Sequence, residues 1–239
     1  MTAVRGLHRH VLAGIAALVL GGVALVLVSR HLGAHDDTGL GPDAPTFALR
    51  AGALDSSRVP FASHADGTPF GSYLQQTLDF APFADLFAAV NATAGTLRSR
   101  GEAHVTVVSP PEFERVLKPA GVAIGEIEAI AMRAGIQRAR LAPVCLGRFS
   151  GALPNPATDD DRGRFLLYSL VVADAFGDLA RIRQEVFKLY RERGGEGALF
   201  QPEAFWPHVT IGFDRRDLFV EDGLYKGANW CYAHIRSTP

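Results

Sequence analysis

The sequence has little or none of several features, and each absence narrows the class of protein. Its 239 residues include only 2 Cys, 2 Met and 2 Trp, and the roughly 209 residues after the first 30 can bury a core without a disulfide framework. No long low-complexity stretch occurs, which excludes a fibrous, collagenous or largely disordered chain. The 24 Lys and Arg side chains face 25 Asp and Glu. Proteins that grip long nucleic acid need a basic excess, so we expect no long nucleic acid surface.

Several motifs that carry chemistry are missing as well. The chain has no P-loop, no dinucleotide-binding glycine fingerprint after a strand and no His-Glu-x-x-His. Residues 147–151 misplace the serine of a nucleophile elbow, and the acidic run at 159–161 lacks the ligand spacing of a calcium loop. The two cysteines are too far from partner residues to suggest zinc. We expect no metal and no cofactor.

One long apolar run does occur, near the N-terminus. Residues 11–29 carry no charge, and 15 of these 19 residues are Ala, Val, Ile or Leu, which is long enough to cross a bilayer core of roughly 30 Å. Arg5 and Arg9 precede the run, so we predict a cytoplasmic segment at 1–10, a transmembrane signal anchor at 11–29 and an extracytoplasmic domain. Cleavage of the anchor would instead give a secreted protein. Without Arg5, Arg9 and Arg30, the 24 basic residues fall to 21 against 25 acidic ones, a net charge of −4.

The rest of the chain divides into a linker and one folded domain. Residues 30–70 are rich in Gly, Pro, Asp and Ser, which predicts a stalk, and the domain then covers 71–239. Hydrophobic periodicity predicts strands at 73–80, 104–108, 136–149, 165–173, 207–213 and 229–236, and helices at 83–100, 112–118, 124–134 and 179–193. This order lacks the steady alternation of a doubly wound sheet, so it favours an α+β fold.

The most informative feature is a short repeat. Residues 104–107 read His-Val-Thr-Val, and 208–211 read His-Val-Thr-Ile. Because side chains alternate along a strand, each copy places its His and Thr on one face and its Val on the other. One interpretation is a pair of buried strand histidines without chemistry. Two complete copies half a domain apart instead favour a duplicated lobe with two catalytic His-Thr pairs.

These two motifs resemble those of the 2H phosphoesterase superfamily, which is named for two H-x-T/S-x motifs with an apolar last position. The flanking residues 101–103, 110–113 and 205–207 are similar to those of the Swiss army knife clade, which is related to RNA-repair enzymes. The resemblance implies two pseudo-symmetric lobes whose antiparallel sheets face a central cleft. It also implies a metal-independent phosphodiesterase that acts on a 2′,3′-cyclic phosphate or related phosphodiester of a nucleotide or RNA end.

The chemistry of the residues agrees with this resemblance. Opening a cyclic phosphate needs a base, an acid and donors to the phosphoryl oxygens, and His titrates in the range that suits the first two roles. We therefore predict His104 and His208 as acid and base, without deciding between them, and Thr106 and Thr210 as phosphoryl donors. An RNA 2′-5′ ligase or hydrolase and a non-catalytic cyclic-nucleotide-binding module are the alternatives. A monomer is expected.

Further side chains are weaker candidates for contacts with the substrate. The aromatic ones, which could stack on a base, are Tyr73, Phe205 and Trp206, and the cations, which could bind a second phosphate, are Arg148, Arg215 and Lys226. Packing is the simpler role for the aromatic residues, and solvent exposure for the cations. Cys145 and Cys231 either form one disulfide that closes a long loop or are two buried free thiols.

Overall fold

A computed structural model of the chain describes residues 38–154 and 156–239, and these belong to one compact unit, Thr38–Pro239. Its strands are β1 (Thr46–Arg50), β2 (Leu74–Leu78), β3 (Ala103–Val108), β4 (Leu141–Ala152), β5 (Arg164–Asp174), β6 (His208–Phe213) and β7 (Cys231–Thr238). Its longer helices are α2 (Ala81–Ala94), α4 (Ile124–Ala134) and α5 (Asp178–Glu192). Short helical turns follow β3 at Pro110–Glu112 (α3), Phe113–Leu117 and Lys118–Ala120. The predicted strands and helices of the domain are therefore present, with shifted ends.

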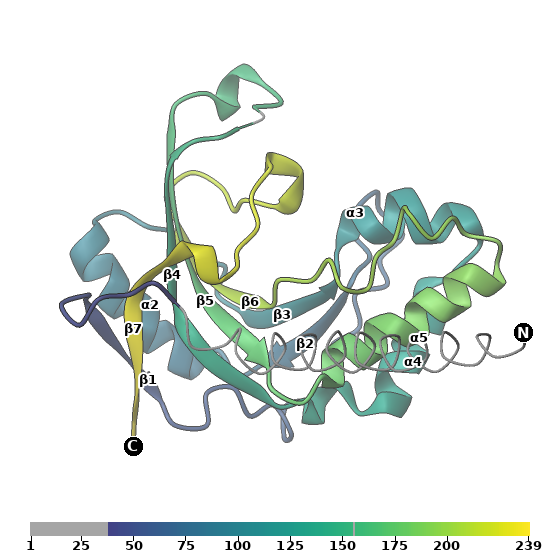
Figure 1. The fold of residues 1–239 in the computed structure, drawn as a ribbon, viewed down its shortest axis with the longest axis horizontal. Coiled ribbons are helices and arrows are strands. Elements are labelled where there is room, and N and C mark those ends of the chain that lie inside the picture. Colours follow the sequence, from purple (N-terminus) through teal and green to yellow (C-terminus); the bar gives the residue numbers. More distant parts are fainter. Residues whose placement is uncertain (1–37, 155) are drawn as a thin grey trace, which may run out of the picture. The chain divides into compact units, whose positions relative to one another are not determined.

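Two sheets form the centre of the unit (Figure 1). The larger has five strands in the order β1-β7-β4-β5-β6, and the smaller pairs β2 with β3. The sheets meet where β3 lies beside β6. There, the backbones of Arg98 and Phe213 exchange hydrogen bonds of 2.7 and 3.0 Å. Helix α2 packs against β1 and β6, whereas α4 and α5 pack together, α4 against β2 and α5 against β3 and β5. This arrangement brings the two motif strands together.

The hydrophobic core has a main part and a small satellite. Alternation on the motif strands puts Val105 and Val209 in the main core, where both are almost fully buried. The satellite joins the β4–β5 hairpin to the segment 214–227 that follows β6. Its buried members are Leu153, Phe165, Leu167, Leu218 and Leu224. Figure 1 shows the hairpin and this segment projecting together from the same side of the sheet. Burial of the leucines thus fixes a segment that has no strand or long helix of its own.

The buried Arg183 of α5 ties the end of one motif strand to the approach to the other. Its guanidinium donates hydrogen bonds to the carbonyl oxygens of Val107 at 2.6 Å and Pro202 at 2.8 Å. It also pairs at 2.8 Å with the carboxylate of Glu112, which caps α3 directly after β3. A planar cation with five donors can satisfy all these acceptors at once. Arg183 therefore fixes the positions of β3 and of the segment that leads into β6.

The helix predicted at 83–100 ends earlier, at Ala94. Gly95 follows it with φ of 92°, a backbone conformation that other residues rarely adopt. The Asn91 side chain then accepts a hydrogen bond of 2.8 Å from the backbone N–H of Leu97. The chain therefore leaves the helix in time to form the Arg98–Phe213 contact beside β6.

The predicted membrane helix needs correction. No helix among residues 38–154 and 156–239 is long and apolar enough to cross a bilayer. The predicted anchor at 11–29 and the cytoplasmic segment at 1–10 lie outside the described residues. The described fold is therefore α+β without a transmembrane helix. The same finding corrects the prediction of a single-pass membrane protein with an extracytoplasmic domain, because the described residues give this prediction no support.

The predicted symmetry and the stalk also differ from the structure. Two pseudo-symmetric lobes with antiparallel sheets were expected, but the sheets have five and two strands, and β1 and β7 are parallel. Strand β1 lies within residues 30–70, the predicted stalk, and the compact unit already begins at Thr38. The pairing partner of β1 is about 190 residues away in sequence, so local periodicity could not indicate it.

The two cysteines form a disulfide that joins Cys145 of β4 to Cys231 at the start of β7, with Cα atoms 5.5 Å apart. This selects one of the two alternatives that the sequence left open. The bond spans 86 residues of chain and lies between adjacent strands of the larger sheet.

Candidate active site

The two predicted motifs lie on the adjacent strands β3 and β6. In β3, His104 is opposite Thr77 and Thr106 is opposite Gln75 of β2. In β6, His208 is opposite Val171 and Thr210 is opposite Ser169 of β5. The strand pattern of both copies alternates half-buried motif side chains with fully buried valines. The structure thus places the two motif strands side by side, each with its His and Thr less buried than the residues between and after them.

His208 is held in one tautomer by the chain itself. Its Nδ1 lies 2.8 Å from the carbonyl oxygen of Trp206, and because a carbonyl only accepts, Nδ1 carries the proton and Nε2 presents a lone pair. Burial, together with charge repulsion from the nearby Lys226 ammonium, lowers the pKa of His208 to about 3. The imidazole is therefore neutral near neutral pH and able to accept a proton at Nε2.

His104 has a different environment. Its Nδ1 is buried without a hydrogen-bond partner, 3.5 Å from a carboxylate oxygen of Glu102. Burial lowers its pKa to about 4, and the carboxylate of Glu102 opposes this shift. The ring centroid of Tyr73 is 6.1 Å from that of His104 and 4.3 Å from that of His64. Glu102 therefore favours the protonated form of His104, whereas Lys226 favours the neutral form of His208.

Thr210 belongs to a buried ionic cluster that the motif alone does not reveal. Its hydroxyl lies 3.1 Å from the carboxylate of Asp217, and Lys226 Nζ lies 3.4 Å from the same hydroxyl and 2.9 Å from Asp217. Lys226 binds Oδ1 of this carboxylate, whereas Arg100, at 2.8 Å, and Thr210 both contact Oδ2. Although burial opposes it, attraction to Lys226 and Arg100 holds the pKa of Asp217 at about 2. One carboxylate thus faces two cations.

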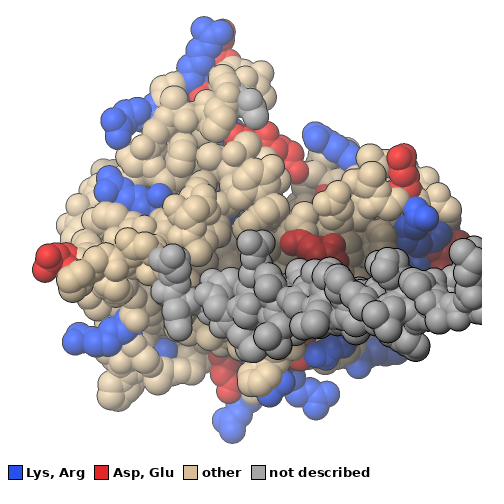
Figure 2. All heavy atoms as spheres, viewed as in Figure 1, with Lys and Arg blue, Asp and Glu red and all other residues tan. Residues whose placement is uncertain are grey.

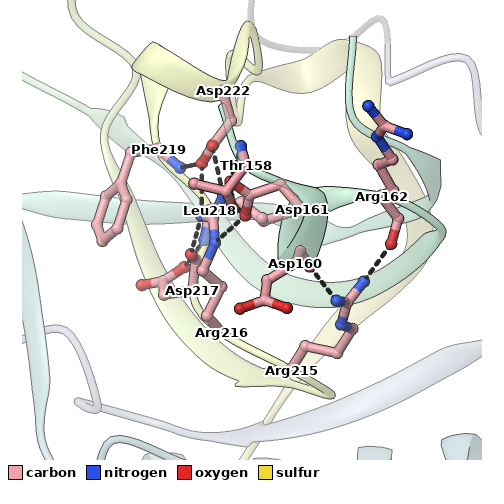
Figure 3. Close-up of polar contacts among 10 residues, drawn as sticks. All are labelled: Thr158, Asp160, Asp161, Arg162, Arg215, Arg216, Asp217, Leu218, Phe219 and Asp222. Carbon is pink, nitrogen blue, oxygen red and sulfur yellow. Dashed lines mark hydrogen bonds and ion pairs between the residues drawn. The ribbon is translucent and has the colours of Figure 1, made fainter. Parts of the chain in front are cut away.

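Segment 214–227, which carries Asp217 and Lys226, is fixed by a second ionic cluster (Figure 3). The Arg216 guanidinium binds Asp161 of the β4–β5 hairpin and Asp222, each at 2.7 Å. The same guanidinium donates to the backbone carbonyl of Asp217 at 3.0 Å. In Figure 3 Arg216 lies between the two carboxylates, while Asp217 is directed away from them. Arg216 therefore positions the backbone of the residue that organises the buried cluster.

The weaker sequence candidates divide by location. Trp206 lies near the site with its ring 4.5 Å from that of Tyr225. Phe205 packs under the Arg183 guanidinium. Arg148 lies over the Tyr232 ring, outside the His-Thr surface. Arg215 binds the backbone carbonyls of Asp160 and Arg162 and is therefore occupied in the hairpin contact (Figure 3).

The structure changes what the sequence indicated about Lys226 and adds three residues near it that were not predicted. Lys226 was expected as an exposed cation, but only 4 % of its side chain is exposed. Asp217, Arg100 and Glu102 were not predicted. Glu102 had a detectable signal, since it precedes His104 by two residues and strand alternation places such residues on one face. Asp217 and Arg100 had none, because 117 residues separate these two partners.

The described side chains offer no evident metal centre. Among residues 38–154 and 156–239, no group of three or more His, Cys, Asp or Glu side chains is placed to hold a metal ion. Figure 2 shows Lys and Arg scattered among Asp and Glu on the face drawn, without a continuous basic band there. The two His-Thr pairs, Lys226 and Arg100 are the polar groups described above that can contact an anion.

Two histidines and two threonines from adjacent strands of an α+β domain define a phosphoesterase of the two-histidine class. A family model described as "2H-SAK: Swiss Army Knife, 2H phosphoesterase domain" matches residues 72–219. The chain belongs to this family, as the resemblance of the motifs predicted. No curated protein and no solved structure matches the chain.

Proposed function

We propose that this phosphoesterase hydrolyses a 2′,3′-cyclic phosphate, or a related phosphodiester, of a nucleotide or RNA end. The proposal depends chiefly on one observation: the two motif histidines have unequal electrostatic environments. A base and an acid on the reacting phosphodiester must be in opposite protonation states, and neighbours of opposite charge, Glu102 at His104 and Lys226 at His208, favour such a division. Neither the base nor the acid then has to be an oxygen of the substrate phosphate itself.

His208 is the proposed base. Its Nε2 lone pair removes a proton from water as the water oxygen attacks phosphorus. The hydrogen bond from Nδ1 to the Trp206 carbonyl holds the ring in the required tautomer and stabilises the imidazolium that forms. Burial, supported by the Lys226 ammonium, keeps the free imidazole neutral beforehand.

His104 is the proposed acid. It donates a proton to the sugar oxygen as the bond from phosphorus to that oxygen breaks, which leaves a phosphomonoester and a sugar hydroxyl. The carboxylate of Glu102, 3.5 Å from Nδ1, stabilises the imidazolium before the transfer. The negative charge of a bound phosphodiester raises the pKa of His104 further in the complex. Proton exchange with solvent then restores both histidines.

The test uses the full chain with 2′,3′-cyclic nucleotides and short RNAs that end in a cyclic phosphate. We expect turnover that persists in EDTA and falls by about 10²–10⁴-fold in both His104→Ala and His208→Ala. Loss of turnover in EDTA, or full activity in the two variants, would contradict the mechanism. Joining of RNA ends would support a 2′-5′ ligase instead, and tight binding without turnover a sensor.

The separate roles of the histidines are tested with a p-nitrophenyl phosphodiester. Its leaving group needs no proton, so His104→Ala should recover most of the wild-type rate on this substrate, whereas His208→Ala should remain slow. Equal recovery of both variants, or recovery of His208→Ala alone, would reject the assignment of acid and base.

A further inference from the structure

The cluster at Thr210 holds two cations beside the motif histidines. Lys226 and Arg100 both bind Asp217, and Arg100, whose side chain is 28 % exposed, also lies 3.7 Å from the carboxylate of Glu102. Lys226 and Asp217 are both almost fully buried, with side chains 4 % and 6 % exposed. Asp217 is the carboxylate that Lys226 contacts, and Asp217 shares its charge with Arg100. A buried ammonium whose counter-ion is shared attracts a further anion, because little solvent screens its charge.

The hydrogen bonds at Thr210 indicate which group meets that anion. A carboxylate can only accept hydrogen bonds, so the Thr210 hydroxyl donates to Asp217, 3.1 Å away. The same hydroxyl oxygen accepts from Lys226 Nζ, 3.4 Å away. The single proton of Thr210 is therefore already used. Lys226 has three N–H donors and uses two of them on Asp217 and Thr210, which leaves one donor next to the motif.

The other motif has no such arrangement. Within the described residues, the side chain of Thr106 makes no hydrogen bond, so its proton is free for a ligand. The two His-Thr pairs are thus alike in sequence but different in structure. One presents a hydroxyl donor, and the other presents an ammonium held by a hydroxyl and a carboxylate.

We propose that Lys226 binds one non-bridging oxygen of the substrate phosphodiester, that Thr106 binds the other, and that Thr210 and Asp217 position Lys226. This inference rests on the proposed function and assigns two roles that differ from those that the repeat alone predicts. Lys226 is the catalytic donor of the second half-site, and Thr210 is an acceptor that orients it. A fixed cation at a developing phosphoryl charge stabilises the transition state without reorganisation.

The surroundings of Lys226 support a fixed position for its ammonium. Residues on either side of the cluster are held by the Arg216 ion pairs and by the buried Leu218 and Leu224. The ring of Phe219 covers both Lys226 and Arg100, at 5.8 and 5.9 Å. These contacts keep the cation in place before substrate arrives.

The decisive experiment uses the two phosphorothioate diastereomers of a 2′,3′-cyclic nucleotide, in which sulfur replaces one or the other non-bridging oxygen. Wild type should hydrolyse the diastereomers at unequal rates. Lys226→Met should lower kcat/KM for the all-oxygen substrate by about 10²–10³-fold and bring the rate ratio of the diastereomers towards one. Thr106→Val should change the ratio in the opposite direction. An unchanged ratio in Lys226→Met would overturn the inference, because a merely structural residue slows both diastereomers equally.

Further variants protect the test against misfolding. Lys188→Met removes an exposed lysine of α5 and should leave both the rates and their ratio unchanged. If Lys226→Met does not fold, Thr210→Val decides the question. The inference expects Thr210→Val to lose less than about 10-fold and Thr106→Val to lose more, since only Thr106 donates to phosphate. Equal losses in the two threonine variants would contradict it.

A binding measurement separates this inference from the proposed function. If wild type turns over no cyclic phosphodiester, the proposed function fails, but inorganic phosphate can still be titrated by calorimetry. Lys226→Met should then bind phosphate at least about 10-fold more weakly than wild type and Lys188→Met. Equal binding by all three proteins would reject Lys226 as a phosphate ligand, whatever the reaction.

Discussion

At the scale of single residues, folding keeps both motif histidines of the free protein neutral near neutral pH. Burial lowers the pKa of His104 to about 4 and that of His208 to about 3, against about 6.5 in an unfolded chain. This burial strengthens the charge interactions of Glu102 and Lys226 with the two rings, because little water screens them. The same burial has a cost in stability below neutral pH.

The cost predicts how stability changes with pH. Between about pH 6.5 and pH 4 the unfolded chain binds protons at these histidines that the folded chain does not, so the free energy of unfolding falls as the pH falls. At pH 4 His208 accounts for up to about 3 kcal/mol of this loss. His208→Gln should therefore lose less stability than wild type between pH 7 and pH 4, as measured by guanidinium unfolding.

The outcome that would contradict this prediction is an equal loss in wild type and His208→Gln over that pH range. Above pH 7 both proteins should instead show the same dependence on pH, because the histidine is then neutral in the folded and the unfolded chain. Depression of the Asp217 pKa adds acid sensitivity only below about pH 4, so it does not confuse the comparison.

At the scale of secondary-structure elements, helix α5 connects the two motif strands through Arg183. Its guanidinium takes the place of water as the hydrogen-bond donor to the carbonyl oxygens of Val107 and Pro202, and it pairs with the carboxylate of Glu112. Arg183→Met should lower the free energy of unfolding by about 3–5 kcal/mol, since it leaves buried acceptors and a carboxylate unpaired. Denaturant unfolding measures this change.

The matched control for Arg183 is on the same helix. Arg181 is 63 % exposed and pairs with Asp178 at the surface, so Arg181→Met should change stability by less than about 0.5 kcal/mol. If Arg183→Met were as stable as Arg181→Met, Arg183 would not be the connection that we describe. If both variants fold, reduced turnover only in Arg183→Met would show that the strands had shifted.

The elements also show where periodicity predicts structure well. Helix α4 was predicted at 124–134 and has those bounds, because its apolar face and its glycine stop are both local. The end of helix α2 was predicted six residues too late, at 100 instead of Ala94, because the contact of Arg98 with β6, which the chain makes soon after Gly95, is not local. Strand β1 was missed because its partner β7 is at the other end of the chain.

At the scale of the whole molecule, one disulfide bond joins β4 to β7, two adjacent strands that are far apart in the sequence. The disulfide between Cys145 and Cys231 closes a loop with a sequence separation of 86. On the chain-entropy model, such a closure stabilises the fold by about 4–5 kcal/mol. Replacing both cysteines by alanine should lower the free energy of unfolding by an amount of this order, measured in denaturant.

Reducing agent provides the internal control for the disulfide. Dithiothreitol should destabilise the wild type towards the value of the double alanine variant and should leave the variant unchanged. A wild type that keeps its full stability after the thiols have been shown to be reduced would contradict the assigned contribution. Turnover by the folded double variant would show that the bond supports the fold and not the chemistry.

The sequence by itself determined the family, the α+β class and the four motif residues. These follow from short patterns, since strand alternation places His and Thr on one face wherever the strand lies. Only the tertiary structure decided what distinguishes the two motifs. Glu102 beside His104, Asp217 and Arg100 beside Lys226, and the donor direction of Thr210 depend on groups brought together from separate segments. Charge interactions act through space, and the order of residues does not report distances between segments that meet only after folding.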